Sequence, residues 1–284
     1  MGNLNWKIRF LPLLLAAALA LGSVTAFADG EPAAPETTET TEITSEETEE
    51  SWKANTYTDA QGITYQLNGN FITVTGTSTN FSGGEITIPA TIEKGGISYP
   101  VTGVGDWAFY RCGALKTLTF SGSVDSIGDN AFQYCIALDT VTFSGDVRSI
   151  GFGAFGSCIA LENVTFSSNV GSIGGGAFSG CKALESVTFP GDVGNIENNA
   201  FERCSALTTL TFSGDVDSIG GNAFENCDAL TMIYVPASMP KAKIEMIQAV
   251  LNSSGLQNVQ IVQPEQPSDP ATDPSTPPDP STGT

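Results

Sequence analysis

The sequence predicts a mostly β fold with short helical turns, wound as a solenoid of six 23-residue coils that tile residues 101–238. The six cysteines are all 23 residues apart, at Cys112, Cys135, Cys158, Cys181, Cys204 and Cys227. A phenylalanine lies three residues before each cysteine, and a leucine lies three residues after it. A repeat of about 20–50 residues is typical of folds that stack one structural unit per repeat.

Residues 1–28 predict a secretory signal peptide. Lys7 and Arg9 precede an apolar run, and Ala26-Phe27-Ala28 matches a cleavage site. An uncleaved anchor is the alternative, although the run is short for a membrane span. We therefore expect a secreted, extracellular protein, free or associated with the cell surface, with no membrane insertion after cleavage.

Two β regions are expected before the first coil, after a linker. Residues 29–51 are rich in Glu and Thr, and they predict a disordered acidic linker. Residues 52–100 alternate apolar and polar positions, with hairpin turns expected at Asn68-Gly69 and at Lys94-Gly95-Gly96. We interpret 52–100 as a β cap that covers the open end of the first coil.

Each coil predicts two extended segments and one helical turn. The alternation in 138–143 favours a strand, and Val124 and Ile127 direct a second, shorter strand inward. The stretch between them, such as 128–135, is too short for an independent helix. We expect it to make one turn that places Ala131, Phe132 and Cys135 in the core.

Residues 239–262 predict a small α/β C-terminal cap. Ile244, Ile247 and Leu251 recur at near-helical spacing between Pro240 and Gly255, and a strand is expected after Gly255. Residues 263–284 are rich in Pro, Asp, Ser and Thr, so they predict a disordered tail with polyproline II character.

Charge and composition narrow the function. The net charge of −20 disfavours nucleic acid and anionic lipid as partners. The chain has no histidine, which removes the usual general base and the commonest zinc ligand. We therefore expect no cofactor and no enzymatic activity; a hydrolase that works with carboxylates alone is the catalytic alternative.

The cysteine column predicts a ladder of buried free thiols that act as small apolar residues. Disulfides between neighbouring coils are an alternative, but they need Cβ atoms closer than stacked coils place them. A thiolate metal ladder is another, but the paired C-x-x-C spacing of zinc sites is missing.

The repeated unit I-G-x-x-A-F-x-x-C-x-x-L-x-x-V-x-F resembles the BspA-like class of bacterial leucine-rich repeats, over about Gly62 to Ser238. The departures are Glu197 in place of the Gly of the I-G pair, and Ser in place of the frequent Pro after the strand, except at Pro190. The resemblance implies a leucine-rich-repeat solenoid in a surface or secreted protein that binds other proteins. It implies no catalytic residue.

The outward strand positions are the first candidate surface for a protein partner. They are Thr117, Thr119, Thr140, Thr142, Asn163, Thr165, Ser186, Thr188, Thr209, Thr211 and Tyr234. Strands in these positions form the concave ligand face of leucine-rich repeats generally. One alternative is that threonine simply suits exposed strands; another is an ice-binding ladder, although a concave sheet fits a flat ice plane poorly.

The helical-turn edge is the second candidate. Trp107, Tyr110, Tyr134 and Phe152 occupy positions that hold mostly small or polar residues in other coils. They predict an exposed aromatic cluster in the first three coils, which is typical of an interaction site. The alternative is that they pack against the N-terminal cap or adjoining loops.

The turn after the first strand supplies a third column of oxygen-bearing side chains: Asp146, Asn169, Asp192 and Asp215. We expect each to cap its own turn, with Ca²⁺ binding as the alternative.

Together these features predict a monomeric, non-catalytic protein that binds a host, matrix or cell-wall protein, as in adhesion. The alternative is a structural spacer or cell-wall display module without a ligand of its own.

Overall fold

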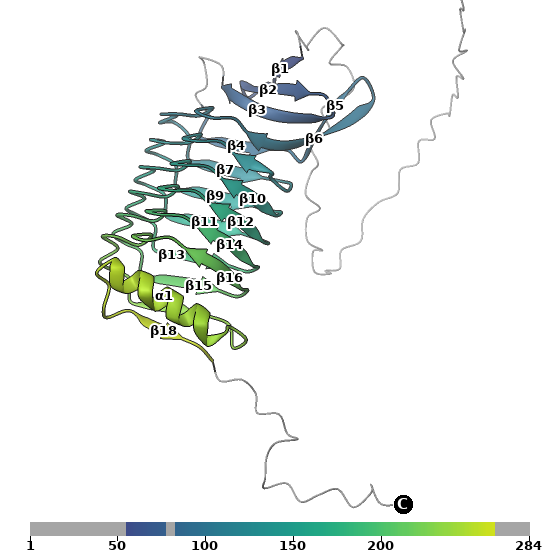
Figure 1. Cartoon of the computed structure of the whole chain (residues 1–284). Coiled ribbons are helices and arrows are strands. Elements are labelled where there is room, and N and C mark those ends of the chain that lie inside the picture. The colour runs from purple at the N-terminus through teal and green to yellow at the C-terminus, as the bar shows by residue number, and fades with distance from the viewer. Residues whose placement is uncertain (1–54, 78–82, 265–284) are drawn as a thin grey trace, which may run out of the picture. The chain divides into compact units, whose positions relative to one another are not determined.

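The computed structural model describes residues 55–77 and 83–264, and it confirms the predicted solenoid of stacked coils (Figure 1). The predicted signal peptide, acidic linker and tail lie outside the described residues, apart from Gln263 and Pro264. The described residues belong to one compact unit.

The strand equivalent to residues 140–143 in each coil joins a parallel sheet along one side of the stack. In spatial order the strands are β4 (Glu85–Ile88), β7 (Thr117–Phe120), β9 (Thr140–Phe143), β11 (Asn163–Phe166), β13 (Ser186–Phe189), β15 (Thr209–Phe212), β17 (Met232–Tyr234) and β18 (Gln260–Val262). Equivalent residues of neighbouring coils lie opposite one another, as Thr117 does to Thr140. The exact 23-residue repeat makes this possible, because it keeps every side chain in register.

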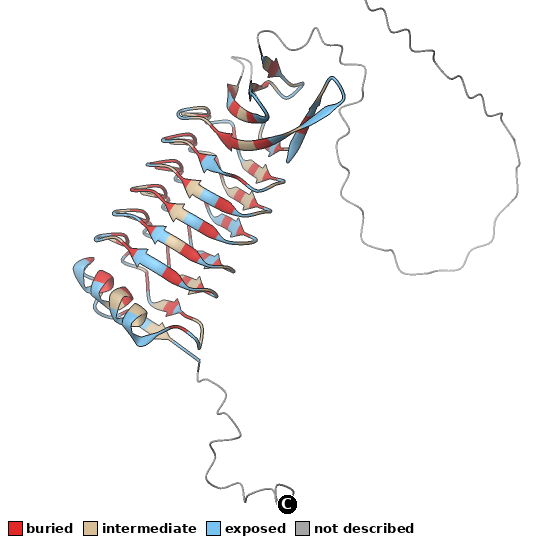
Figure 2. Cartoon of the chain, turned by 45° about the vertical axis from the view of Figure 1, so that its right-hand side comes forward, coloured by how far each residue is buried: buried red, intermediate tan, exposed pale blue. Residues whose placement is uncertain are grey.

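The strand equivalent to residues 147–150 in each coil joins another sheet, which the N-terminal strands extend. Its strands are β1 (Thr56–Thr58), β2 (Ile63–Asn68), β3 (Phe71–Thr77), β6 (Ile97–Val104), β8 (Ser126–Ile127), β10 (Val147–Ile150), β12 (Val170–Ile173), β14 (Val193–Ile196) and β16 (Val216–Ile219), with β5 (Thr91–Lys94) paired to β6. In β7 to β15 of the parallel sheet, buried positions alternate with more exposed ones. In β10, β12, β14 and β16 of the other sheet, the first and last residues are buried and the two between them are more exposed (Figure 2).

The helical-turn edge is held by a third hydrogen-bond ladder that the sequence does not reveal. The predicted helical turn is a series of tight turns, in which Ala131 N–H donates to Gly128 C=O and Cys135 N–H donates to Phe132 C=O. Alternate N–H groups point along the stack instead, so that Phe132 N–H donates to Ala154 C=O at 2.7 Å. Each coil is therefore bonded to the next along all three sides.

Two columns of stacked phenylalanine rings fill the core. Ring centroids in the column from Phe109 to Phe224 are 4.9 to 5.9 Å apart, and those from Phe120 to Phe212 are 4.9 to 5.3 Å apart. Offset-stacked rings at this spacing are favourable beyond the area that they bury. These columns confirm the expected interior.

The six cysteines are free, and all but the half-buried Cys112 are fully buried. Each buried thiol donates to the carbonyl of the phenylalanine 26 residues earlier, as Cys181 Sγ does to Phe155 O at 3.2 Å. The column is thus more than apolar filler, because each thiol gives one carbonyl a second donor beside the backbone N–H that this carbonyl already accepts.

The predicted N-terminal hairpins are both present. β2 and β3 turn at Gly69, and β5 and β6 turn at Gly95 and Gly96, whose positive φ angles suit glycine. β4 already pairs with β7, and β6 with β8, so the division placed at residue 100 falls within β6, which also continues the stack.

The C-terminal cap consists of α1 (Lys241–Ser253) and β18, as the sequence predicts. Ile247, Val250 and Leu251 are the buried residues of the helix. Lys243 Nζ donates to Val216 O at 2.6 Å and forms ion pairs with Asp215 and Asp217. The lysine therefore occupies carbonyl and carboxylate oxygens at the last coil, where no further coil follows.

Candidate functional site

Three of the four predicted aromatic residues meet on the helical-turn edge of the first two coils. The Trp107 and Tyr110 rings are edge to face at 5.0 Å between centroids, and the Tyr110 and Tyr134 rings are edge to face at 5.9 Å. We call Trp107, Tyr110, Arg111 and Tyr134 the aromatic cluster. Trp107 is 53% exposed and Tyr134 is 41% exposed, so much of both rings faces solvent.

Arg111 is the member that sequence reasoning missed. Its guanidinium lies 5.1 Å from the Tyr110 centroid and 5.5 Å from the Tyr134 centroid, within cation–π range of both. Arg111 and Tyr134 are 23 residues apart, so the repeat alone places them in neighbouring coils. That spacing was the available signal.

The backbone under the cluster is left-handed. Trp107, Arg111 and Tyr134 have φ angles of 59°, 59° and 60°. This conformation turns their N–H groups along the stack, where Trp107 donates to Asp129 C=O at 3.0 Å. It costs a side-chain-bearing residue about 1–2 kcal/mol relative to glycine.

Equivalent positions in other coils hold mostly residues that tolerate this conformation. In the Trp107 column they are Asn130, Gly153, Gly176, Asn199 and Asn222, and in the column that Arg111 and Tyr134 share they are Ser157, Gly180, Arg203 and Asn226. The fold therefore gains nothing from an aromatic side chain at either position. Strained residues of this kind concentrate at functional sites.

Phe152 lies apart from the cluster, because no ring contact joins it to the other three within the described residues. It is 60% exposed and lies over Gly175. It lines a shallow groove of about 820 Å³, together with Gln133, Asn199 and Glu202. The predicted four-residue cluster therefore divides into three residues and one.

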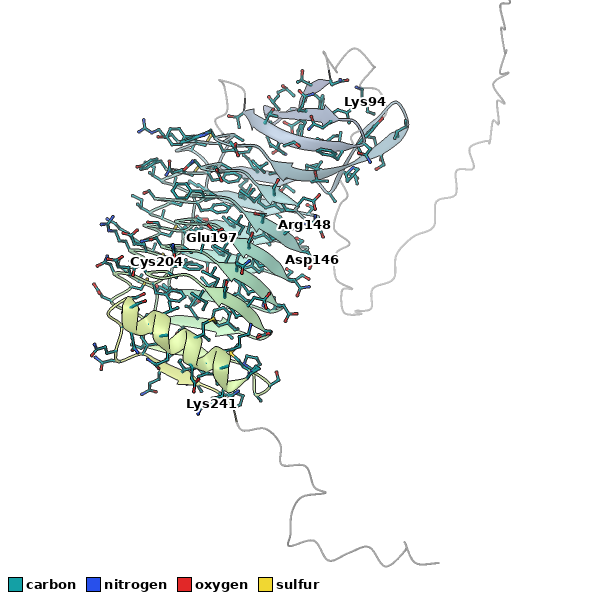
Figure 3. All side chains as sticks on the ribbon, viewed as in Figure 1. Lys94, Asp146, Arg148, Glu197, Cys204 and Lys241 are labelled. Atoms are coloured by element: carbon teal, nitrogen blue, oxygen red, sulfur yellow. The ribbon has the colours of Figure 1, made fainter. Side chains whose placement is uncertain are left out.

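Phe152 also explains the departure at Glu197, which is labelled in Figure 3. Asp106 Oδ1 accepts Asp129 N–H, and Asp129 Oδ1 accepts Phe152 N–H. Phe152 has no acceptor for the next N–H, that of Gly175. Glu197 Oε2, from the following coil, accepts it instead at 3.0 Å.

The outward strand positions form straight rows across the parallel sheet. Thr119, Thr142, Thr165, Thr188 and Thr211 lie opposite one another, and Tyr234, which is 40% exposed, follows Thr211 in the row. Thr117, Thr140 and Thr209 share the second row with Asn163 and Ser186. These rows are chemically uniform, in contrast to the aromatic cluster.

The column of Asp and Asn side chains bonds the next coil, which corrects the expectation that each caps its own turn. Asn169 Oδ1 accepts Asp192 N–H and Asp192 Oδ1 accepts Asp215 N–H, both at 2.9 Å, because the coil spacing brings that N–H within reach. Asp215 alone accepts from its own turn, at Val216 N–H.

Asp146 Oδ1 accepts the Ser168 hydroxyl and Asn169 N–H, and these bonds hold the pKa of Asp146 below its usual value. Within residues 55–77 and 83–264, no group of three acidic or cysteine side chains is arranged to hold a metal ion.

The family profile described as "BspA type Leucine rich repeat region (6 copies)" matches residues 85–170 and 125–248, which is more than half of the chain. The chain belongs to the BspA-type leucine-rich repeat family. The resemblance inferred from the repeated unit is thereby confirmed.

Several solved structures are similar to this BspA-type chain. A leucine rich repeat protein of T. pallidum is 23% identical, over 68% of this chain and 95% of that one, with a TM-score of 0.46. A leucine-rich repeat protein from Bacteroides capillosus is 25% identical, over 56% and 98%, with a TM-score of 0.38. A leucine rich cell surface protein from Faecalibacterium prausnitzii is 18% identical, over 73% and 94%, with a TM-score of 0.30.

No curated protein matches this BspA-type chain. Among the described residues, no helix is long and apolar enough to cross a membrane. A leucine-rich repeat of this family is consistent with a protein-interaction module. Leucine-rich repeat proteins are typically non-catalytic, and the surface residues described above are the candidates for a function of this chain.

Proposed function

We propose that this protein is a secreted or cell-surface module that binds a host, matrix or cell-wall protein without catalysis, through the aromatic cluster. The observation that supports the proposal is the free-energy cost of the backbone conformations in the cluster. Trp107, Arg111 and Tyr134 hold left-handed backbone conformations that favour Gly and Asn, yet they expose large side chains there.

The composition of the cluster supports the same function. Trp, Tyr and Arg are the residue types that dominate binding energy at protein interfaces. Edge-to-face packing holds the rings in fixed positions, which lowers the entropy lost on binding. Two further exposed apolar residues, Ile136 and Ile159, occur in the second and third coils, at a position where coils four to six carry Lys182, Ser205 and Asp228.

The alternative function is a spacer that displays other segments and has no ligand. The uniform threonine rows favour it, because a binding face usually varies in chemistry along its length. The two functions differ in what removal of the aromatic side chains does.

The test replaces cluster residues with those that other coils hold at the same positions. Trp107→Asn and Tyr134→Asn should leave the fold intact or slightly stabilised, because Asn tolerates the left-handed conformation. Binding to immobilised host-matrix protein and to the producer's cell-wall fraction should fall at least tenfold. Circular dichroism and thermal melting verify the fold of each variant.

Matched controls come from the other two surfaces. Phe152→Asn copies Asn198, and Tyr234→Thr copies Thr211. Both should leave binding unchanged. A loss confined to Tyr234→Thr would move the site to the threonine rows, and no binding by any form of the protein would favour the spacer.

A further inference from the structure

We propose that the aromatic cluster binds the proline-rich C-terminal segment of this same chain, residues 265–284, in polyproline II form. This inference rests on the proposed role of the cluster as a binding surface, and it names an occupant. The segment lies outside the described residues; its sequence and the geometry of the cluster support the inference.

The cluster has the chemistry that recognises polyproline II. Trp107, Tyr110 and Tyr134 set their rings at steep angles, 76° and 82° between neighbouring planes, which leaves exposed apolar walls. Aromatic-lined surfaces of this kind bind proline rings between their walls. Because polyproline II has no internal hydrogen bonds, its carbonyls remain free for the indole N–H and the phenolic O–H groups.

The segment has the matching pattern. Prolines at 264, 267 and 270, and again at 274 and 277, recur at intervals of three. Polyproline II has about three residues per turn, so prolines spaced in this way share one face. An extended segment rich in proline also loses little entropy when it binds.

Charge favours one part of the segment. Arg111 forms no ion pair with any of the described residues, although its guanidinium is fixed over two rings. Asp279 stands between Pro278 and Pro280 and is the one charged residue of 276–284. A single carboxylate among prolines therefore meets a single guanidinium among aromatic rings.

The segment is long enough to span the stack from the last strand to the level of the cluster in its own molecule. Six strand spacings separate β18 from β7 in the parallel sheet, or about 29 Å at roughly 4.8 Å each. Residues 265–276 span about 37 Å in polyproline II, at roughly 3.1 Å per residue. Pro277-Pro278-Asp279-Pro280 can then lie against the cluster, and a second copy can be bound in the same way.

The test uses Trp107 as its own reporter. The chain from Asp29 onward with Trp52→Phe retains Trp107 as its single tryptophan. Acrylamide quenching is compared between this protein and a variant in which Pro277, Pro278 and Pro280 are replaced by Ser. We expect the Stern–Volmer constant to rise at least twofold in the proline variant. The matched control replaces Ser275, Thr276 and Ser281 with Ala, and it should leave quenching unchanged.

A synthetic peptide of residues 264–284, added to the proline variant, should restore protection in a saturable way, and Arg111→Asn should weaken that binding. If the protection of Trp107 in the protein with the unaltered tail does not depend on protein concentration between about 1 and 100 µM, the bound segment belongs to the same molecule. Protection that rises with concentration assigns a second copy.

Equal quenching with and without the prolines, together with no binding of the peptide, overturns the inference. The proposed function is judged separately, by capture of matrix or cell-wall protein. If that capture depends on Trp107 while the peptide does not bind, the tail inference fails and the function stands. If the peptide binds but capture is insensitive to Trp107→Asn, the proposed external partner fails instead.

Discussion

At the scale of single residues, the cysteine column links burial to pH. Cys181 is fully buried, and burial raises the pKa of its thiol to about 12 from an ordinary value of 9.0. A thiol whose folded pKa is raised contributes stability that is fully present below its unfolded pKa and is lost as pH rises toward the folded one. We therefore expect the free energy of unfolding to fall between pH 9 and 12.

Cys181 alone should lower the free energy of unfolding by about 2 kcal/mol at a pH of about 10.5, since one pKa unit corresponds to about 1.4 kcal/mol. Urea unfolding at neutral and alkaline pH measures it, and Cys181→Ala should remove that part of the slope. In the native protein at neutral pH, the five buried thiols should also resist alkylation. An unfolding free energy independent of pH up to pH 12 contradicts the assignment.

The residue-level features differ in how far the sequence reveals them. The repeat places Phe132, Cys135 and Leu138 in the core, because a constant column must face the same way in every coil. The left-handed backbone at Trp107 and Tyr134 is harder to predict. It follows from the inter-coil bonds of the turn edge, and the only trace in the sequence is Asn or Gly at the equivalent positions.

At the scale of elements, the side-chain bonds that link neighbouring coils along the turn edge change partner at Phe152, and this change can be tested. Glu197→Ala leaves the buried Gly175 N–H without its acceptor, which should cost about 1–2 kcal/mol. Glu197→Gln keeps an acceptor oxygen and should cost much less. Adding Phe152→Asp to Glu197→Ala should recover most of the loss, because Asp106 and Asp129 already bond the next coil in this way.

Chemical denaturation of the unaltered protein, Phe152→Asp, Glu197→Ala and the double variant gives the coupling energy between positions 152 and 197. Additive effects would mean that Phe152 and Glu197 are independent departures from the repeat. The sequence showed both departures but not their connection, since they lie in coils two repeats apart and meet only through the Gly175 N–H.

The strands, hairpins and C-terminal helix were predictable because each has a local signal: alternation, an Asn-Gly turn, or helical spacing after Pro240. The use of β4 as the first strand of the parallel sheet had no such signal. Its residues do not carry the repeat motif, and only its parallel pairing to β7 places it in the stack. Residues 101–104 of β6, in contrast, already belong to the first predicted coil.

At the scale of the whole molecule, stability in a stack of coils is close to a sum of nearest-neighbour terms, so damage at one end should stay there. Lys243→Met removes the donor to Val216 O and the ion pairs to Asp215 and Asp217. Hydrogen bonds from a charged donor are worth about 1.5–3 kcal/mol. Amide exchange should therefore accelerate in β16 and β17 and stay unchanged in β7 and β9. Lys241→Met is the matched control, because its side chain is 90% exposed and pairs only with Glu245; such a pair contributes about 0.5 kcal/mol or less. Equal acceleration along every coil would show that the stack opens as one cooperative unit, and that the cap does not act locally.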